Sequence, residues 1–128
     1  MIDKRLLKIA SNTKFYGLKN NYTYKTNLKN SICGDKISIE ISLKKNTIQE
    51  LRYETEACIF CQASASTLAN IAKNTNLGDL RKNLSKYLNL SKKVPKKFNN
   101  LTYLLKDKYM NRKDCILLPF KAFYKAIK

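Results

Sequence analysis

Four cysteines and one aspartate are the residues of this 128-residue chain that most plainly could do chemistry. Cys33 lies two residues before Asp35, Cys58 and Cys61 form a C-x-x-C pair, and Cys115 lies near the C-terminal end. Structural disulfides are rare in the cytosol, where we expect this chain to reside. Metal binding or thiol chemistry is therefore the leading explanation for the cysteines.

The chain contains no histidine. Ser–His and Cys–His nucleophile pairs and His-ligated zinc or haem are therefore excluded. Three thiolates and one carboxylate could hold a tetrahedral zinc ion, and soft thiolates with one carboxylate could hold a [2Fe–2S] cluster. We expect a site with one oxygen ligand to be more labile than an all-thiolate site, which suits a site that passes its contents on.

Alternating apolar and polar residues predict the sheet that must position these side chains. Residues 36–43 alternate Ile or Leu with polar residues, and residues 48–57 repeat this alternation after a short turn at 44–46. Period two is typical of half-buried strands, so the two runs form an antiparallel hairpin. Residues 21–27 are rich in β formers and predict an edge strand.

The remaining chain favours helices. Helical spacing predicts helices over 2–11, 61–73, 78–90 and 98–108, a basic turn at 91–97, Gly78 as the stop of the 61–73 helix, and a last helix that starts at Pro119. Strands followed by helices favour an α+β fold, in which helices pack on one face of a small antiparallel three-stranded sheet. We expect residues 1–128 to form a single domain.

The hairpin also predicts where the chemical side chains meet. The start of its first strand lies beside the end of its second, which brings Cys33, Asp35 and Cys58 to one edge of the sheet. Cys115 joins them if the last helix packs back on the sheet. Cys61 begins the 61–73 helix and is a buried apolar residue, an extra ligand or a resolving thiol. Arg112, three residues before Cys115, is a surface charge or, as we favour, stabilises a thiolate or steers a partner.

The formal net charge is +17, from 26 basic and 9 acidic residues, which raises the question of a polyanionic partner. Nearly all basic residues are lysines, whereas arginine reads phosphates and base edges, so nucleic acid is not the expected partner.

The longest uncharged stretch, 57–72, carries many polar residues and is no membrane span. The first residues lack the apolar core of a secretory signal, so we expect a full-length cytoplasmic protein.

Three runs of residues resemble motifs of the IscU/NifU-like iron–sulfur assembly proteins. Residues 30–35 (NSICGD) resemble the N-P-x-C-G-D run of that family, and residues 56–66 (EACIFCQASAS) resemble its G-C-x-I-S-x-A-S-A-S run. Residues 112–118 (RKDCILL) are similar to its R-x-x-C-x-x-L run. Order and spacing agree, and the resemblance spans residues 2–127.

The resemblance implies a SufE/NifU-like fold and a site formed by Cys33, Asp35, Cys58 and Cys115 that binds zinc, iron or a [2Fe–2S] cluster. It implies a scaffold or sulfur carrier rather than an enzyme, although a sulfurtransferase relay stays open. Persulfide sulfur would come from a SufS-like cysteine desulfurase to Cys115 or Cys33, with Arg112 assisting, and downstream iron–sulfur proteins would receive the cluster. The alternative is a zinc-binding adaptor or regulator without sulfur transfer.

Within the family, the SufU branch is nearest. A long insertion follows Cys58, and Arg112 precedes the last cysteine by three residues, as in that branch. Asp114 stands where the IscU branch has histidine. Ala57 replaces the family's glycine, and Cys61 stands where many members have serine.

Overall fold

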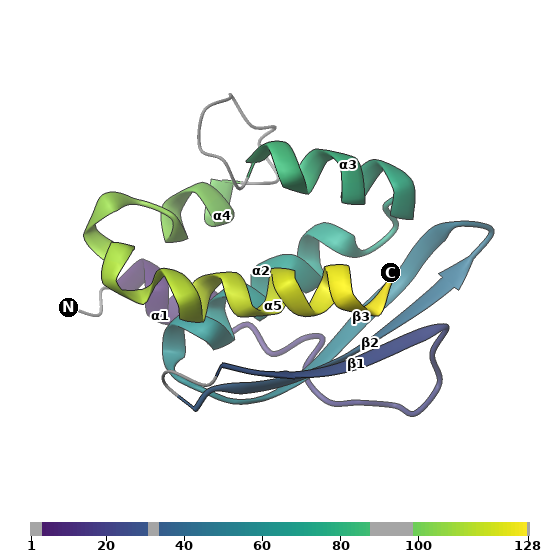
Figure 1. Cartoon of the computed structure of the whole chain (residues 1–128), viewed down its shortest axis with the longest axis horizontal. Helices are drawn as coiled ribbons and strands as arrows, with labels where there is room; N and C mark the ends of the chain where they lie inside the picture. Colours follow the sequence, from purple (N-terminus) through teal and green to yellow (C-terminus); the bar gives the residue numbers. More distant parts are fainter. Residues whose placement is uncertain (1–3, 31–33, 88–98, 128) are drawn as a thin grey trace.

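A computed structural model describes residues 4–30, 34–87 and 99–127, and Figure 1 shows a layer of helices over a small sheet. The sheet consists of three antiparallel strands in the order β1-β2-β3, namely β1 (Tyr24–Lys29), β2 (Lys36–Lys44) and β3 (Thr47–Glu56). The predicted hairpin is β2–β3, and the predicted edge strand is β1, which starts at Tyr24 instead of Asn21.

The helices are α1 (Lys4–Ala10), α2 (Ile59–Ala72), α3 (Leu77–Tyr87), α4 (Asn99–Leu104), the 3₁₀ helix η2 (Asp107–Arg112) and α5 (Lys113–Ala126). Helix α2 packs against α1, α4, α5 and β3, and α5 packs against β1 and β2. The predicted α+β class, with helices over a three-stranded antiparallel sheet, is confirmed. None of the helices in the described ranges has both the length and the apolar composition needed to cross a membrane.

The core lies between the two layers. Ile37, Ile39 and Ile41 of β2 are at most 1% exposed, and Tyr53 and Leu51 of β3 lie opposite the last two of them. These alternate positions face the helices, because successive side chains of a strand point to opposite faces. The period-two pattern of the sequence therefore reports the buried face of the central strand.

Small residues let α2 lie at the centre of the helical layer. Residues 63–66, Ala-Ser-Ala-Ser, are at most 2% exposed. The hydroxyl of Ser64 donates a hydrogen bond to the carbonyl of Ile116 in α5, and the hydroxyl of Ser66 donates one to the carbonyl of Asn12. Short side chains allow close approach, and the two buried hydroxyls find partners on neighbouring segments, as buried polar groups must.

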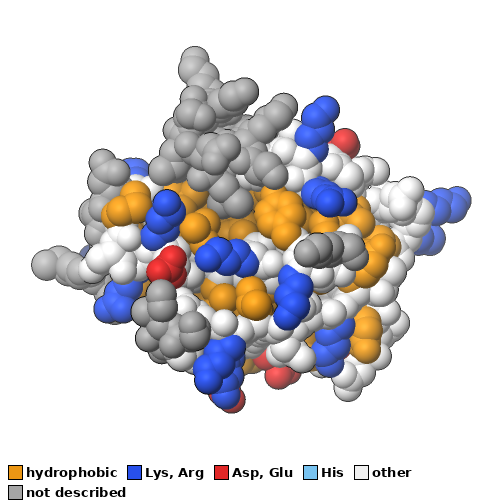
Figure 2. All heavy atoms as spheres, viewed as in Figure 1, with side chains coloured by type: hydrophobic (Ala, Val, Ile, Leu, Met, Phe, Trp, Pro, Cys, Tyr) orange, Lys and Arg blue, Asp and Glu red, His pale blue; other side chains and the backbone are white. Residues whose placement is uncertain are grey.

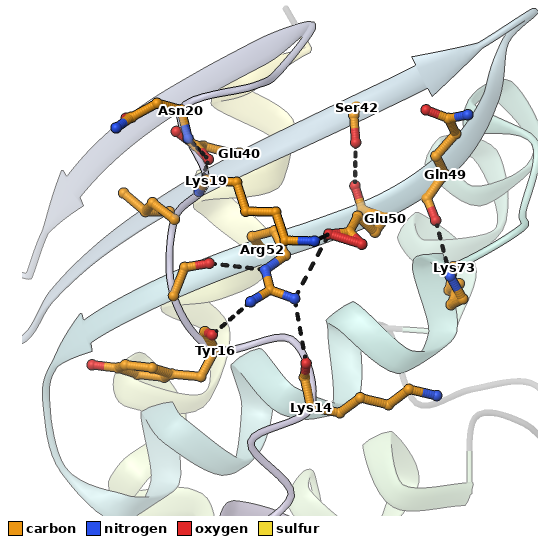
Figure 3. Close-up of polar contacts among 12 residues, drawn as sticks. Lys14, Tyr16, Lys19, Asn20, Glu40, Ser42, Gln49, Glu50, Arg52 and Lys73 are labelled. Carbon is orange, nitrogen blue, oxygen red and sulfur yellow. Dashed lines mark hydrogen bonds and ion pairs between the residues drawn. The ribbon is translucent and has the colours of Figure 1, made fainter.

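The outer face of the sheet is partly covered by the loop that precedes β1. Arg52 on β3 donates hydrogen bonds to the carbonyls of Lys14, Tyr16 and Gly17, at 3.3, 2.8 and 2.8 Å, and forms an ion pair with Glu50 at 3.7 Å (Figure 3). One guanidinium thus fixes three residues of the loop, since its donors have a rigid, planar arrangement.

A second anchor of this loop is Glu40, which is only 2% exposed although it lies on the polar face of β2. Its carboxylate accepts hydrogen bonds from the backbone N–H groups of Lys19 and Asn20, at 2.9 and 3.1 Å, and lies 3.7 Å from the Lys25 ammonium. Burial of a charge requires such partners. The sequence pattern did not indicate that the segment before β1 covers this face of the sheet.

The predicted start of the last helix at Pro119 is wrong. Helix α5 begins at Lys113, and Pro119 lies inside it, so Cys115 is within the helix instead of before it. Proline lacks an N–H, which removes the ordinary helical partner of the Cys115 carbonyl. Phe120 and Phe123 are at most 1% exposed, so packing against the core outweighs this loss.

Two other boundaries also differ from the prediction. Gly78 lies inside α3, and α2 ends at Ala72, after which Asn74 adopts the left-handed conformation with φ of 60°. Asparagine tolerates this conformation better than most residues. The predicted helix 98–108 is interrupted after α4, and the predicted basic turn at 91–97 lies outside the described residues.

Candidate metal centre

Asp35, Cys58 and Cys115 meet at one end of the sheet. One ligand atom of each, a carboxylate oxygen and two thiol sulfurs, lies within 4.8 Å of the other two. Metal–ligand bonds of 2.0–2.3 Å keep any two ligands within about 4.6 Å, so the three donors are already near the required spacing. In Figure 1 the starts of β2, α2 and α5 lie at the same end of the molecule.

The turn between β1 and β2 positions Asp35. The Asn30 N–H donates to the Asp35 carbonyl at 2.7 Å, and the Gly34 N–H donates to the Asn30 carbonyl at 2.8 Å. Gly34 has φ of +76°, which other residues rarely adopt, whereas an added Cβ would meet no atom within 4 Å. The backbone conformation, and not crowding, therefore favours glycine between the positions of Cys33 and Asp35.

The carboxylate of Asp35 is directed at Cys58. It is 6% exposed, and its two oxygens accept hydrogen bonds from the Cys58 N–H at 3.4 Å and from the Cys58 thiol at 3.7 Å. Cys58 is the N-cap residue of α2, and Cys115 is the third residue of α5 and 5% exposed. Both cysteines thus lie at the N-terminal end of a helix, where the unpaired backbone N–H groups leave a partial positive charge.

The other predicted site residues lie apart from this group or outside the description. Cys61 is the third residue of α2, where the sequence predicted the first; it is fully buried in the core and does not belong to the group within 4.8 Å. Arg112 is exposed at the N-cap of α5, with its guanidinium carbon 5.7 Å from the centroid of the Phe60 ring. Cys33 lies outside the described residues. Cys58, Cys61 and Cys115 are free of disulfides.

Sequence reasoning missed one residue that supports the site. The Ser64 hydroxyl bonds the carbonyl of Ile116, the residue that follows Cys115. This bond joins the helix that starts at Cys58 to the helix that carries Cys115. The Ala-Ser-Ala-Ser run was the available signal, because two serines inside an apolar helix need partners.

The family model described as the NifU-like N-terminal domain matches residues 3–118. A curated relative, the iron–sulfur cluster assembly scaffold protein IscU of Thermotoga maritima, is 24% identical over 136 residues, covering 100% of this chain and 93% of that protein. The chain is also similar to two solved structures at 22% identity. The N-terminal part of a NifU-like protein of Brucella abortus has a TM-score of 0.81, with 98% of this chain and 90% of that one covered.

The second solved structure is an iron–sulfur cluster assembly scaffold protein for the SUF system of Fervidobacterium islandicum, FiSufU. Its TM-score is 0.78, with 99% of this chain and 96% of that one covered. The structural likeness supports the fold, and the family model covers nearly the whole chain. The three sequence runs and the family model agree, and this chain belongs to the NifU-like N-terminal domain family.

Proposed function

We propose that this chain is an iron–sulfur cluster assembly scaffold that holds iron, or a nascent [2Fe–2S] cluster, as its cargo. The observation that carries the proposal is the meeting of Asp35, Cys58 and Cys115, because each comes from a different sequence run and all three offer ligand atoms within 4.8 Å. Two thiolates and a carboxylate suit iron or zinc. Family membership and the IscU relative support the same function.

Cys33 would complete the site. It lies two residues before Asp35, on the far side of Gly34, and would supply the third sulfur of a Cys3Asp set. Asp35 would be its labile member, because a carboxylate is a weaker ligand than thiolate for iron in a cluster. A scaffold must release its cargo, so one exchangeable ligand serves that purpose.

Sulfur would reach the site from a persulfide on a SufS-like cysteine desulfurase. A thiolate, Cys115 or Cys33, attacks the outer sulfur of the persulfide and forms a new S–S bond. The S–S bond of the desulfurase breaks, its cysteine leaves as a thiolate, and the proton stays on the transferred sulfur. Arg112, at the start of α5 and exposed, would steer the partner or stabilise the charged sulfur.

Metal and acid-labile sulfide analysis of anaerobically purified protein tests the scaffold role. We expect iron and sulfide together with visible charge-transfer bands, and their loss in Cys58→Ser and Cys115→Ser. Cys61→Ser is the matched control, since this buried thiol lies outside the group of three ligands. Zinc without sulfide, in a protein that cannot be loaded with a cluster, would contradict the scaffold role.

Persulfide trapping tests the sulfur transfer separately. After incubation with desulfurase and isotopically labelled cysteine, mass spectrometry should locate the labelled sulfur on Cys115 or Cys33. Label on neither of them would exclude these two as acceptors. A zinc-loaded protein that takes no labelled sulfur would support the adaptor function instead.

A further inference from the structure

Away from the metal centre, α1, α2 and α4 border an open groove of about 670 Å³. Its described lining residues include two cations, Arg5 and Lys8, together with amide and hydroxyl side chains, and no acidic residue. Ile9 and Ile71 add apolar surface. The groove is therefore positively charged, and its lining combines polar groups with a larger share of apolar surface.

Arg5 is held in place at the groove. Its guanidinium carbon lies 4.1 Å from the centroid of the Tyr103 ring, and its Nη2 donates to the amide oxygen of Asn100 at 3.4 Å. Tyr103 is 8% exposed and packs edge-on against Tyr109, with 6.0 Å between the two ring centroids. Such pre-ordering lowers the entropy lost on binding, and a planar guanidinium suits a carboxylate.

Amides of the groove suit a peptide backbone. Three asparagine amides line the groove, and each already uses one of its two polar groups: the oxygens of Asn12 and Asn100 accept from the Lys14 N–H and from Arg5, and the Asn70 nitrogen donates to the Ser66 carbonyl. The other polar group of each amide can pair with the N–H or C=O groups of an extended peptide. Ile9 and Ile71, which are 7% and 4% exposed, contribute only the apolar floor of the groove. We propose that this groove docks an extended acidic peptide segment of a partner protein.

The observations disfavour nucleic acid as the occupant. Single strands are bound by exposed aromatic rings, but Tyr103 is covered by Arg5 and has the Lys106 ammonium 5.1 Å from its centroid. Figure 2 shows basic side chains spread over the face of α5 instead of gathered in one stripe, so the charge on this face marks no path for a nucleic-acid strand. A peptide that places a few carboxylates beside Arg5 and Lys8 matches the charge of the groove better than a nucleic-acid strand does.

Fluorescence anisotropy with a labelled short peptide of alternating glutamate and leucine tests the proposal. The double variant Arg5→Gln, Lys8→Gln should bind about tenfold more weakly, the effect of losing about 1.4 kcal/mol of binding free energy. The matched control Lys29→Gln, Lys44→Gln removes the same charge from exposed strand residues, and should change the affinity less than about twofold.

Several outcomes would overturn the proposal. They are equal losses in the two double variants, no preference for the glutamate peptide over a lysine–leucine peptide, or RNA binding that only the groove variant loses. Arg5→Lys should lose part of the affinity, because it keeps the charge but not the planar donors. Cys115→Ser should bind the peptide normally, so a failure of the scaffold function and a failure of the groove are distinguishable.

Discussion

Replacing Ser64 with alanine should loosen the metal centre although Ser64 is not one of its three ligands. Ser64 is fully buried, and its hydroxyl bonds the Ile116 carbonyl across the α2–α5 contact. Loss of a buried partner costs about 1–3 kcal/mol. Since Pro119 cannot bond the Cys115 carbonyl, the start of α5 depends more on this cross-helix bond. We therefore expect Ser64→Ala to lower the free energy of unfolding by about 2 kcal/mol, or the Tm by roughly 8 °C.

Urea unfolding followed by circular dichroism measures this cost, with Thr67→Val as the matched control. Thr67 is 4% exposed on the same helix, but its hydroxyl bonds the Ala63 carbonyl within α2, and valine keeps its shape. Thr67→Val should cost less than about 1 kcal/mol. Equal losses in the two variants would refute the special role of the cross-helix bond.

The same two variants test the consequence for metal binding. Ile116 follows Cys115, so loss of its bond to Ser64 should let Cys115 move away from Cys58. Competition with a chromophoric chelator should show weaker zinc binding in Ser64→Ala and unchanged binding in Thr67→Val. An unchanged zinc affinity in both variants would show that the Ser64–Ile116 bond stabilises the fold without positioning Cys115, and would contradict this prediction.

Three further predictions concern other parts of the molecule. Asp35→Ala should retain bound metal longer in a chelator challenge, because the exchangeable oxygen ligand is gone; faster release would contradict this role. Arg52→Met removes three hydrogen bonds to the 14–17 loop, and should cost about 2 kcal/mol and speed amide exchange there. Burial raises the pKa of Tyr53 above the ordinary 10.0. The unfolded chain therefore releases this proton first, and stability falls as pH rises above 10.0. Tyr53→Phe should flatten that fall in unfolding experiments, and an unchanged slope would exclude Tyr53 as its source.

The convergence of the site was predictable because it follows from local rules. Period-two alternation on both sides of a short turn predicts the β2–β3 hairpin, and a hairpin places the start of β2 beside the end of β3. That geometry brings Asp35 and Cys58 together whatever the helices do. Cys115 was harder, since its place depends on how α5 packs on the sheet, which is a tertiary contact.

The errors arose where tertiary packing overrides local preference. Proline is favoured at the first turn of a helix, so the sequence predicts that α5 starts at Pro119. The buried side chains of α5 pack in the core and keep the residues on both sides of Pro119 helical. Glu40 has the sequence position of a solvated strand residue and is buried because the loop before β1 crosses that face. The residues next to Pro119 and Glu40 in the sequence do not determine these two results, because both depend on segments that are distant along the chain.

The Ala-Ser-Ala-Ser run shows why ligands and packing cannot be separated in this site. Residues 63–66 do not belong to the group of three ligands, yet their small size lets α2 contact α5, and Ser64 joins the two helices beside Cys115. Cys58 caps the same helix. The distance between the two thiols is thus set by how closely α2 and α5 approach. A larger residue at Ser64 would separate the sulfurs while leaving every ligand in the sequence.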